Sequence, residues 1–127
     1  TITGAASAAP VSQGHVMLIR CAFFEGKVNP GCHEAFALFV KERLVPLWTQ
    51  FPGAEEVRVL RQTESDTENP HYAMVLAIRY PDVAALEKAM ESDVRAQSRA
   101  ETGELVKMFE GRIFHTVFEA AHDVVLT

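Results

Sequence analysis

The residues best suited to proton transfer are three histidines, each within a stretch typical of a β-strand. They are His15, His71 and His115. A neutral imidazole, with an ordinary pKa of about 6.5, is well matched to act as a base near neutral pH. His115 lies in the middle of its stretch, between Phe114 and Val117, so we take it as the candidate general base. His15 and His71 begin their stretches, where contact with water is enough to explain them.

Two arginines interrupt stretches that are otherwise apolar, Arg20 in the first and Arg79 in the third strand-like segment. A buried guanidinium is unfavourable unless an acid or an anionic ligand accompanies it. Two interpretations stay open for each arginine. It binds an anionic ligand, or it pairs with an acid such as Glu56, Glu119 or a carboxylate of a partner chain.

Aromatic residues that carry a polar atom could complete such a site. Tyr72, Tyr80 and Trp48 each join an apolar ring to a hydrogen-bonding group, which suits a pocket wall or the core. The candidate catalytic residues are therefore His115 as base, with Arg20 or Tyr72 orienting a substrate. We expect this site in a cleft between the sheet and its helices.

Metal and cofactor motifs are missing from the sequence. No two histidines stand in an H-x-H or H-x3-H pair, and the sequence contains no HExxH, CxxC, G-x-S-x-G or phosphate-binding glycine loop. Convergent ligands on one element are the usual basis of a metal site. We expect no metal and no cofactor.

The composition favours a single domain that binds neither nucleic acid nor membranes. The chain has 127 residues and a net charge of -5, and its lysines and arginines form no basic cluster in the sequence. No apolar run reaches the roughly 18 residues that a membrane span needs. Cys21 and Cys32 form no disulfide framework, which predicts free thiols in a reducing cytoplasm.

Hydrophobic periodicity predicts four strands. Residues 15–24 and 71–80 are apolar on both alternating faces, so both should be central strands of one sheet. Residues 55–63 and 112–119 alternate between apolar and polar side chains, which is typical of half-exposed strands. The polar turn between residues 55–63 and 71–80 predicts a hairpin.

Helical patterns follow the first and the third strand. After the first, apolar residues recur at helical spacing up to Pro46, which lacks an N–H and should kink or end the helix. After the third, Asp82 and Ser92 are candidate N-caps of two segments, and Gly103 is expected to interrupt the second. The order β-α-β-β-α-β predicts an α+β, ferredoxin-like fold. Its four-stranded antiparallel sheet runs in the order fourth, first, third, second, with the helices on one face.

The helices of such a fold cover only one of two apolar sheet faces. A monomer would then expose a large apolar patch, so we expect a homodimer in which two sheets face each other. We assign residues 15–119 to the domain and residues 120–127 to a C-terminal tail that is loosely attached or lent to a partner. Residues 1–14 lack the pattern of a secretory signal, and we expect a flexible N-terminal tail.

Several segments resemble the EthD-like family of dimeric α+β barrels, and the resemblance covers residues 15–119. They are the loop NPGCHEAF, the helix ending VPLWTQFPG, the hairpin strands, and AALEKAMESDVRAQ followed by LVKMFEGRIFHTVFE. Many members carry H-x-P-L at the first helix; here Leu44-Val45-Pro46-Leu47 keeps the proline and leucine and has Leu44 at the histidine position. The resemblance implies a dimeric barrel with a role in degradation or polyketide-type pathways.

Two functions of different classes remain open. The first is a small cofactor-independent enzyme or accessory protein that acts on or binds an apolar or aromatic metabolite in degradation or secondary metabolism. The second is a non-catalytic dimeric binding or structural protein, which the leucine at position 44 and the lack of a compact catalytic group favour. Haem degradation on the same fold would need an axial histidine on a helix, and the sequence offers no convincing one.

Overall fold

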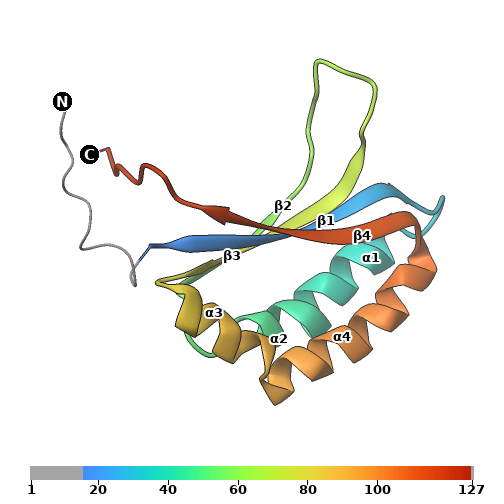
Figure 1. Cartoon of the computed structure of the whole chain (residues 1–127). Helices are drawn as coiled ribbons and strands as arrows, with labels where there is room; N and C mark the ends of the chain where they lie inside the picture. Colours follow the sequence, from blue (N-terminus) through green and yellow to red (C-terminus); the bar gives the residue numbers. More distant parts are fainter. Residues whose placement is uncertain (1–15, 127) are drawn as a thin grey trace.

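The computed structural model describes residues 16–126, and its strands form a four-stranded antiparallel sheet in the order β2-β3-β1-β4 (Figure 1). The strands are β1 (Leu18–Val28), β2 (Glu56–Leu60), β3 (Tyr72–Tyr80) and β4 (Phe109–Glu119). The central pair, β1 and β3, consists of the two stretches that are apolar on both faces. The predicted strand order, the hairpin of β2 and β3 and the α+β class are confirmed. The expectations for residues 1–14 and for His15 lie outside the described residues.

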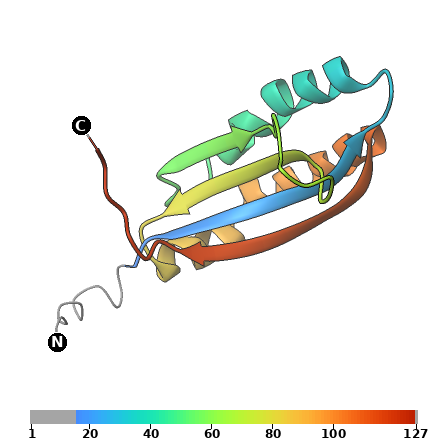
Figure 2. The same cartoon turned by 90° about the horizontal axis from the view of Figure 1, so that it is seen from above.

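The helices lie together on one face of the sheet (Figures 1 and 2). They are α1 (His33–Phe39), η2 (Val40–Leu44) and α2 (Val45–Trp48) after β1, and α3 (Val83–Met90), α4 (Asp93–Leu105) and η3 (Val106–Met108) after β3. We call the helix-covered face of the sheet the inner face and the opposite face the outer face.

Pro46 does not end the first helical segment. The segment passes through a π-helical turn, η2, directly before α2, where the proline occupies a position in the first turn. A proline has no N–H to donate to the carbonyl four residues earlier, and a wider turn at that point lets the helix continue. The segment therefore reaches Trp48, which is 2% exposed and faces the core.

Both predicted N-caps are confirmed. The carboxylate of Asp82 accepts a hydrogen bond from the Ala85 N–H at 2.9 Å, and the Ser92 hydroxyl accepts one from the Arg95 N–H at 3.3 Å. The expectation that Gly103 interrupts the second helix is wrong, because α4 continues to Leu105. A glycine lowers helix propensity by only about 1 kcal/mol relative to alanine. Leu105 is completely buried, and its packing holds the last turn.

The core lies between the inner face of the sheet and the helices. Alternate residues of β1 and β3 meet the buried side chains of the helices, as the period of two in a strand requires. The main contributors are Ala22, Phe24, Met74, Leu76, Ile78 and Tyr80 from the strands and Phe36, Val40, Leu44, Trp48 and Leu105 from the helical segments.

The outer face has an apolar, largely aromatic centre with charged residues such as Arg58 and Arg79 around it, and no helix within residues 16–126 covers it (Figure 1). The ring of Phe23 lies 5.0 Å from that of Phe114 and 5.6 Å from that of Tyr72, measured between centroids. Toward the sheet edges, Leu60 and Phe118 are 47% and 48% exposed. This surface is the uncovered apolar face that the sequence predicts.

Strand β1 extends beyond its predicted end at residue 24. It continues to Val28 because Gly26 and Gly111 pair directly across β1 and β4. Their φ angles are +142° and +152°, and a Cβ atom on either glycine would overlap backbone atoms of the opposite strand. The two glycines therefore permit a close approach of two strands in a segment that the sequence predicted as loop.

Candidate functional site

A cavity of about 370 Å³ lies on the inner face of the sheet, between the strands and α4. Its volume falls within the range of roughly 300–1,000 Å³ that is typical of small-molecule sites. Most of its wall is apolar, and a smaller group of polar side chains faces the same space. The lining residues are Arg20, Ala22, Phe24, Trp48, Phe51, Leu76, Ile78, Arg95, Ser98, Arg99, Thr102, Ile113 and His115.

Helix α4 supplies most of the polar wall. Arg95, Ser98, Arg99 and Thr102 all line the cavity. They stand at positions i, i+3, i+4 and i+7, which fall on one face of an α-helix. A helix packed on a sheet normally turns apolar residues toward it, so this stripe makes the inner surface of α4 polar and basic.

Two hydrogen bonds fix the middle of α4 against its surroundings. The indole N–H of Trp48 donates to the Ser98 hydroxyl at 3.0 Å, in a buried position. The Thr102 hydroxyl donates to the Ser98 carbonyl at 2.8 Å. A hydrogen bond of this kind contributes about 1 kcal/mol net. Trp48 thus connects α2 to α4 across the end of the cavity.

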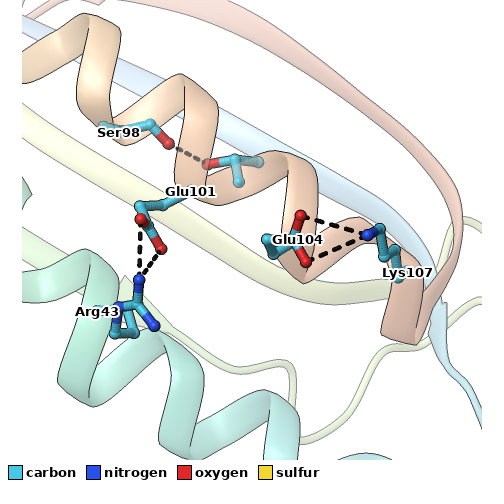
Figure 3. Close-up of polar contacts among 6 residues, drawn as sticks. Arg43, Ser98, Glu101, Glu104 and Lys107 are labelled. Carbon is cyan, nitrogen blue, oxygen red and sulfur yellow. Dashed lines mark hydrogen bonds and ion pairs between the residues drawn. The ribbon is translucent and has the colours of Figure 1, made fainter.

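Outside the cavity, an ion pair joins α4 to η2 (Figure 3). A guanidinium nitrogen of Arg43 lies 2.8 Å from one carboxylate oxygen of Glu101 and 2.9 Å from the other. On the same helix Glu104 pairs with Lys107 at 3.2 Å. Exposed ion pairs contribute less than about 1 kcal/mol each to stability. The main consequence of these two pairs is that Glu101 and Glu104 interact with cations outside the cavity.

Arg20 and His115 come from adjacent strands. His115 pairs with Ala22 in the β1–β4 register, two positions along β1 from Arg20. Side chains in that diagonal relation share one face of the sheet and lie within reach of long residues. The structure therefore brings two of the three predicted site residues, His115 and Arg20, into the same cavity.

The cavity holds positive charge that disfavours a further proton. Partial burial lowers the pKa of His115 to about 4, and repulsion from Arg20, Arg95 and Arg99 contributes to the shift. Burial also lowers the pKa of Arg20, with further repulsion from Arg95 and Arg99. His115 still contacts solvent. At neutral pH its imidazole is uncharged and can accept a proton.

Tyr80 lies deeper, next to the same arginines. It is completely buried, and its hydroxyl has no hydrogen-bond partner among the described residues. Burial raises its pKa to about 12, although Arg20 and Arg95 act in the opposite direction. The phenol is therefore protonated at neutral pH, in the core rather than in the cavity wall.

Tyr72, the third predicted site residue, lies on the opposite face of the sheet. Counting alternate residues of the strand from Met74 assigns Tyr72 to the inner face, but the register of β1 and β3 shifts between Phe24 and Glu25. Phe24 pairs with Met74 and Glu25 with Tyr72, so Ala73 is an extra residue in a β-bulge. The bulge turns the tyrosine ring outward onto Phe23. Its expected role beside His115 does not fit this position.

The remaining polar candidates have ordinary structural environments. Arg79 pairs with Glu55 at 3.3 Å, so it meets an acid, although neither Glu56 nor Glu119. His71 precedes β3, where its carbonyl accepts a hydrogen bond from the Gly26 N–H at 2.8 Å. Neither residue lines the cavity. For Arg20 no ion pair is found within residues 16–126, so neither Glu56 nor Glu119 pairs with it. An anionic ligand and a carboxylate of a partner chain both stay open.

Sequence reasoning missed the contribution of α4. In the sequence, Glu91, Asp93 and Arg95 have the pattern of a solvated helix face, but in the structure Arg95 lines the cavity together with Arg99. The polar residues at helical spacing that begin at Arg95 could have indicated this contribution. Whether they line a cavity or face solvent depends, however, on which face of the helix the sheet covers.

Two further properties concern the described residues as a whole. Between residues 16 and 126, no group of three or more His, Cys, Asp or Glu side chains is arranged to hold a metal ion. In the same range, no helix combines the length and the apolar character of a membrane span. Cys21 and Cys32 are free thiols, and burial raises the pKa of Cys21.

Comparison with solved structures finds the same architecture in several proteins. An ethyl tert-butyl ether d (EthD) family protein from Bacillus halodurans matches with a TM-score of 0.62 and 21% identity, over 81% of this chain and 97% of its own. This chain has the ferredoxin-like fold of an EthD protein. A dimeric protein of ferredoxin-like fold from Bacteroides fragilis matches with a TM-score of 0.59 and 10% identity, over 81% and 95% of the two chains.

The fold is shared with an oxygenase as well. SnoaB, a cofactor-independent oxygenase from Streptomyces nogalater, matches with a TM-score of 0.57 and 15% identity, over 86% of this chain and 97% of its own. Comparisons with protein-family models and with curated protein sequences find no match. At these identities the likeness concerns the fold, and the chemistry has to be argued from the cavity.

The EthD-type histidine position is a core residue in this chain. Leu44 is completely buried and packs in the hydrophobic core, and it does not line the cavity. Leu44 therefore cannot supply a base to this cavity, and the imidazole that lines it belongs to His115 of β4.

Proposed function

We propose that this protein binds a small molecule with an apolar or aromatic body in the cavity beside α4 and removes a proton from it. His115 acts as the base, and Arg20 orients the substrate. The observation that carries the proposal is the position of His115 and Arg20 on adjacent strands in one largely apolar cavity of about 370 Å³. The similar fold of SnoaB, a cofactor-independent oxygenase, supports chemistry that uses side chains alone.

The chemical step is a single proton transfer. The neutral His115 imidazole takes a proton from an acidic C–H or O–H of the substrate, so that this bond breaks and an N–H bond forms. The electron pair stays on the substrate as an enolate or phenolate. The guanidinium groups of Arg20 and Arg95 stabilise this charge, as donors directed at a developing anion do in a partly dehydrated site.

The proposal includes a homodimer. Two copies facing each other through their outer faces would cover the Phe23, Phe114 and Tyr72 rings. The protein of similar fold from Bacteroides fragilis is dimeric, which supports dimerisation. The cavities would lie on the far side of each sheet and stay open. The free thiols of Cys21 and Cys32 suit the cytoplasm, and a role in degradation or secondary metabolism suits a ligand of this kind.

The second candidate is a dimeric protein that binds such a molecule without transforming it. Two observations favour it. The pKa of His115, about 4, makes the imidazole a weak base in the empty cavity. The cavity also lacks a second proton-transfer residue, because Tyr72 lies on the outer face.

Solvent exchange into a carbon acid separates the two candidates. We expect the protein in D₂O to accelerate deuterium incorporation at the benzylic carbon of phenylpyruvate or its methyl ester, followed by proton NMR. The His115→Gln variant should lower the catalysed rate by about 100-fold or more, which is the usual contribution of a general base. His71→Gln is the matched control, since His71 does not line the cavity.

Each outcome has a distinct meaning. Acceleration that depends on His115 and not on His71 supports proton transfer. Binding of either compound without faster exchange, followed through the fluorescence of Trp48, the single tryptophan, supports the binding protein and excludes the enzyme. Acceleration that survives in His115→Gln would assign the base elsewhere and contradict the proposed mechanism.

A further inference from the structure

Three arginines and a histidine face one cavity, and no acid in the described part of the chain faces it with them. Arg20 belongs to β1, Arg95 and Arg99 to α4, and His115 to β4. The ion pairs found within residues 16–126 involve other cations, namely Arg43, Arg58, Arg79, Lys107 and Arg112. Grouping guanidinium charges in a partly buried space without a counter-charge is unfavourable.

The cluster is not a consequence of a basic chain. The sequence has 17 Asp and Glu against 12 Lys and Arg, for a net charge of -5. Acids on α4 itself turn elsewhere, as Glu101 pairs with Arg43 of η2 and Glu104 with Lys107 (Figure 3). In an acidic protein, Arg95 and Arg99 of α4 thus face the cavity, while two of the three acids of this helix, Glu101 and Glu104, pair with cations outside it.

The hydroxyl groups of the cavity are already engaged. Ser98 accepts a hydrogen bond from the Trp48 indole at 3.0 Å, and the Thr102 hydroxyl donates to the Ser98 carbonyl at 2.8 Å. Arg95 uses one guanidinium nitrogen on the Met90 carbonyl at 3.2 Å, which leaves its other donors available. Each hydroxyl keeps some hydrogen-bonding capacity, but the positive charges that face the cavity at neutral pH are the guanidinium groups, whose planar donors match a carboxylate in pairs.

The rest of the wall is suited to a flat apolar body. Trp48 and Phe51 contribute aromatic surface, and Leu76, Ile78 and Ile113 contribute aliphatic surface from the strands. A ligand that satisfies both regions is amphiphilic, with a negative group against the arginines and an apolar ring system against Trp48 and the strands.

We infer that the ligand of this cavity is an aromatic organic anion of the carboxylate class, held by Arg20, Arg95 and Arg99. The inference deepens the proposed function and rests on its assignment of the ligand site to this cavity. It assigns Arg95 and Arg99 as the residues that select a charged ligand over a neutral one of the same shape. It also gives the anion a second effect, because a negative charge near His115 offsets the three guanidinium groups and makes the imidazole a stronger base.

Binding of a charged and an uncharged isostere tests the inference. With the full chain, we expect calorimetry to give at least tenfold tighter binding for 2-naphthoate than for 2-naphthamide. Arg99→Gln, at an exposed position of α4, should reduce this preference several-fold, and Arg95→Gln combined with Arg99→Gln should reduce it further, to the part that Arg20 alone supplies. Arg61→Gln is the control, because it removes the same charge at an exposed position outside the cavity.

Histidine NMR provides a readout that loss of packing would not reproduce. The groups that face His115 are Arg20 from β1 and Arg95 and Arg99 from α4. Saturating 2-naphthoate should raise the pKa of His115 from about 4, and 2-naphthamide should leave it unchanged. Thermal melts of each variant show whether the fold is intact.

The outcomes separate the inference from the proposed function. Equal affinity of the wild-type chain for the two probes overturns the anionic ligand and leaves an apolar binding cavity. A preference that is undiminished without Arg95 and Arg99 overturns the assignment of these two arginines. Binding of neither probe overturns both the inference and the cavity as a ligand site. Anion preference together with a raised His115 pKa supports the inference even if no proton exchange is catalysed.

Discussion

His115 combines two properties that normally oppose each other in a base. Burial, and after it the charges of the three cavity arginines, lower its pKa to about 4, so the imidazole is unprotonated at neutral pH and free to accept a proton. The same charges destabilise the imidazolium that proton transfer would produce. Proton transfer to His115 therefore becomes favourable when a negative charge forms or binds near Arg20. His115 is thus suited to a substrate that becomes an anion.

A pH-dependent stability follows from the His115 environment. Its pKa is about 4 in the folded chain and about 6.5 when unfolded, so the unfolded chain binds the proton first as the pH falls. Stability from this residue is complete above about pH 6.5 and decreases toward pH 4. We expect His115→Gln to lose less unfolding free energy than the wild-type chain between pH 7 and pH 5, measured by urea denaturation.

A matched histidine checks this assignment. His33 is exposed on α1 and does not face the cavity, so His33→Gln should keep the wild-type decrease between pH 7 and pH 5. An equal decrease in wild type and His115→Gln would contradict the charge environment described for the cavity.

At the scale of elements, β1 and β4 approach closely where Gly26 meets Gly111. Both residues have positive φ angles, and a side chain on either would occupy space held by the backbone of the other strand. This contact lets the end of β1 stay paired with the start of β4, as far as Val28 and Phe109. In the same segment, the side chains of Glu25 and Arg112 form an ion pair at 2.7 Å.

Glycine substitutions at two positions should have opposite effects. We expect Gly111→Ala to lower the unfolding free energy by about 2 kcal/mol or more, because the strands must separate to admit the methyl group. Gly103→Ala should raise it by about 0.5–1 kcal/mol, because that glycine lies in α4 with open space around it. Chemical denaturation measures both, and a neutral Gly111→Ala would refute the close approach.

Local patterns predicted the elements and only part of the site. Strand and helix periodicity, the caps at Asp82 and Ser92, and the double-faced apolar strands are properties of neighbouring residues, so the fold could be inferred from them. Arg20 stood out because a charge interrupted an apolar strand. Arg95 and Arg99 did not stand out, because charged residues are common on helices. Their position in the cavity can be recognised only when it is known which face of α4 the sheet covers.

At the scale of the whole molecule, the sheet separates two surfaces. Residues of β1 alternate between the cavity and the outer face, so that Arg20 lines one and Phe23 the other. A partner chain on the outer face would therefore contact and stabilise β1, the strand that carries Arg20, without contacting the ligand.

A charge on the outer face should prevent dimerisation. We expect Phe114→Glu to convert a dimer into a monomer in sedimentation experiments, because the carboxylate would be buried against a second apolar sheet. Phe118→Glu makes the same test at a side chain that is already 48% exposed, where the folded monomer can accept a charge. Leu38→Glu on α1 is the control and should stay dimeric, and a wild-type chain that sediments as a monomer would contradict the proposed assembly.

The bulge at Ala73 has a consequence for comparing this chain with others. Whether the tyrosine at position 72 faces the cavity or the outer surface depends on one extra residue in β3, not on the residue type. If β1 and β3 paired here without the bulge, and the tyrosine stayed two residues before Met74, it would lie on the inner face of the sheet. Deletion of Ala73 would instead place the tyrosine directly before Met74, where it would still pair with Glu25 and face outward. The role of residue 72 in a related chain therefore depends on how the two strands pair as well as on the number of residues in β3.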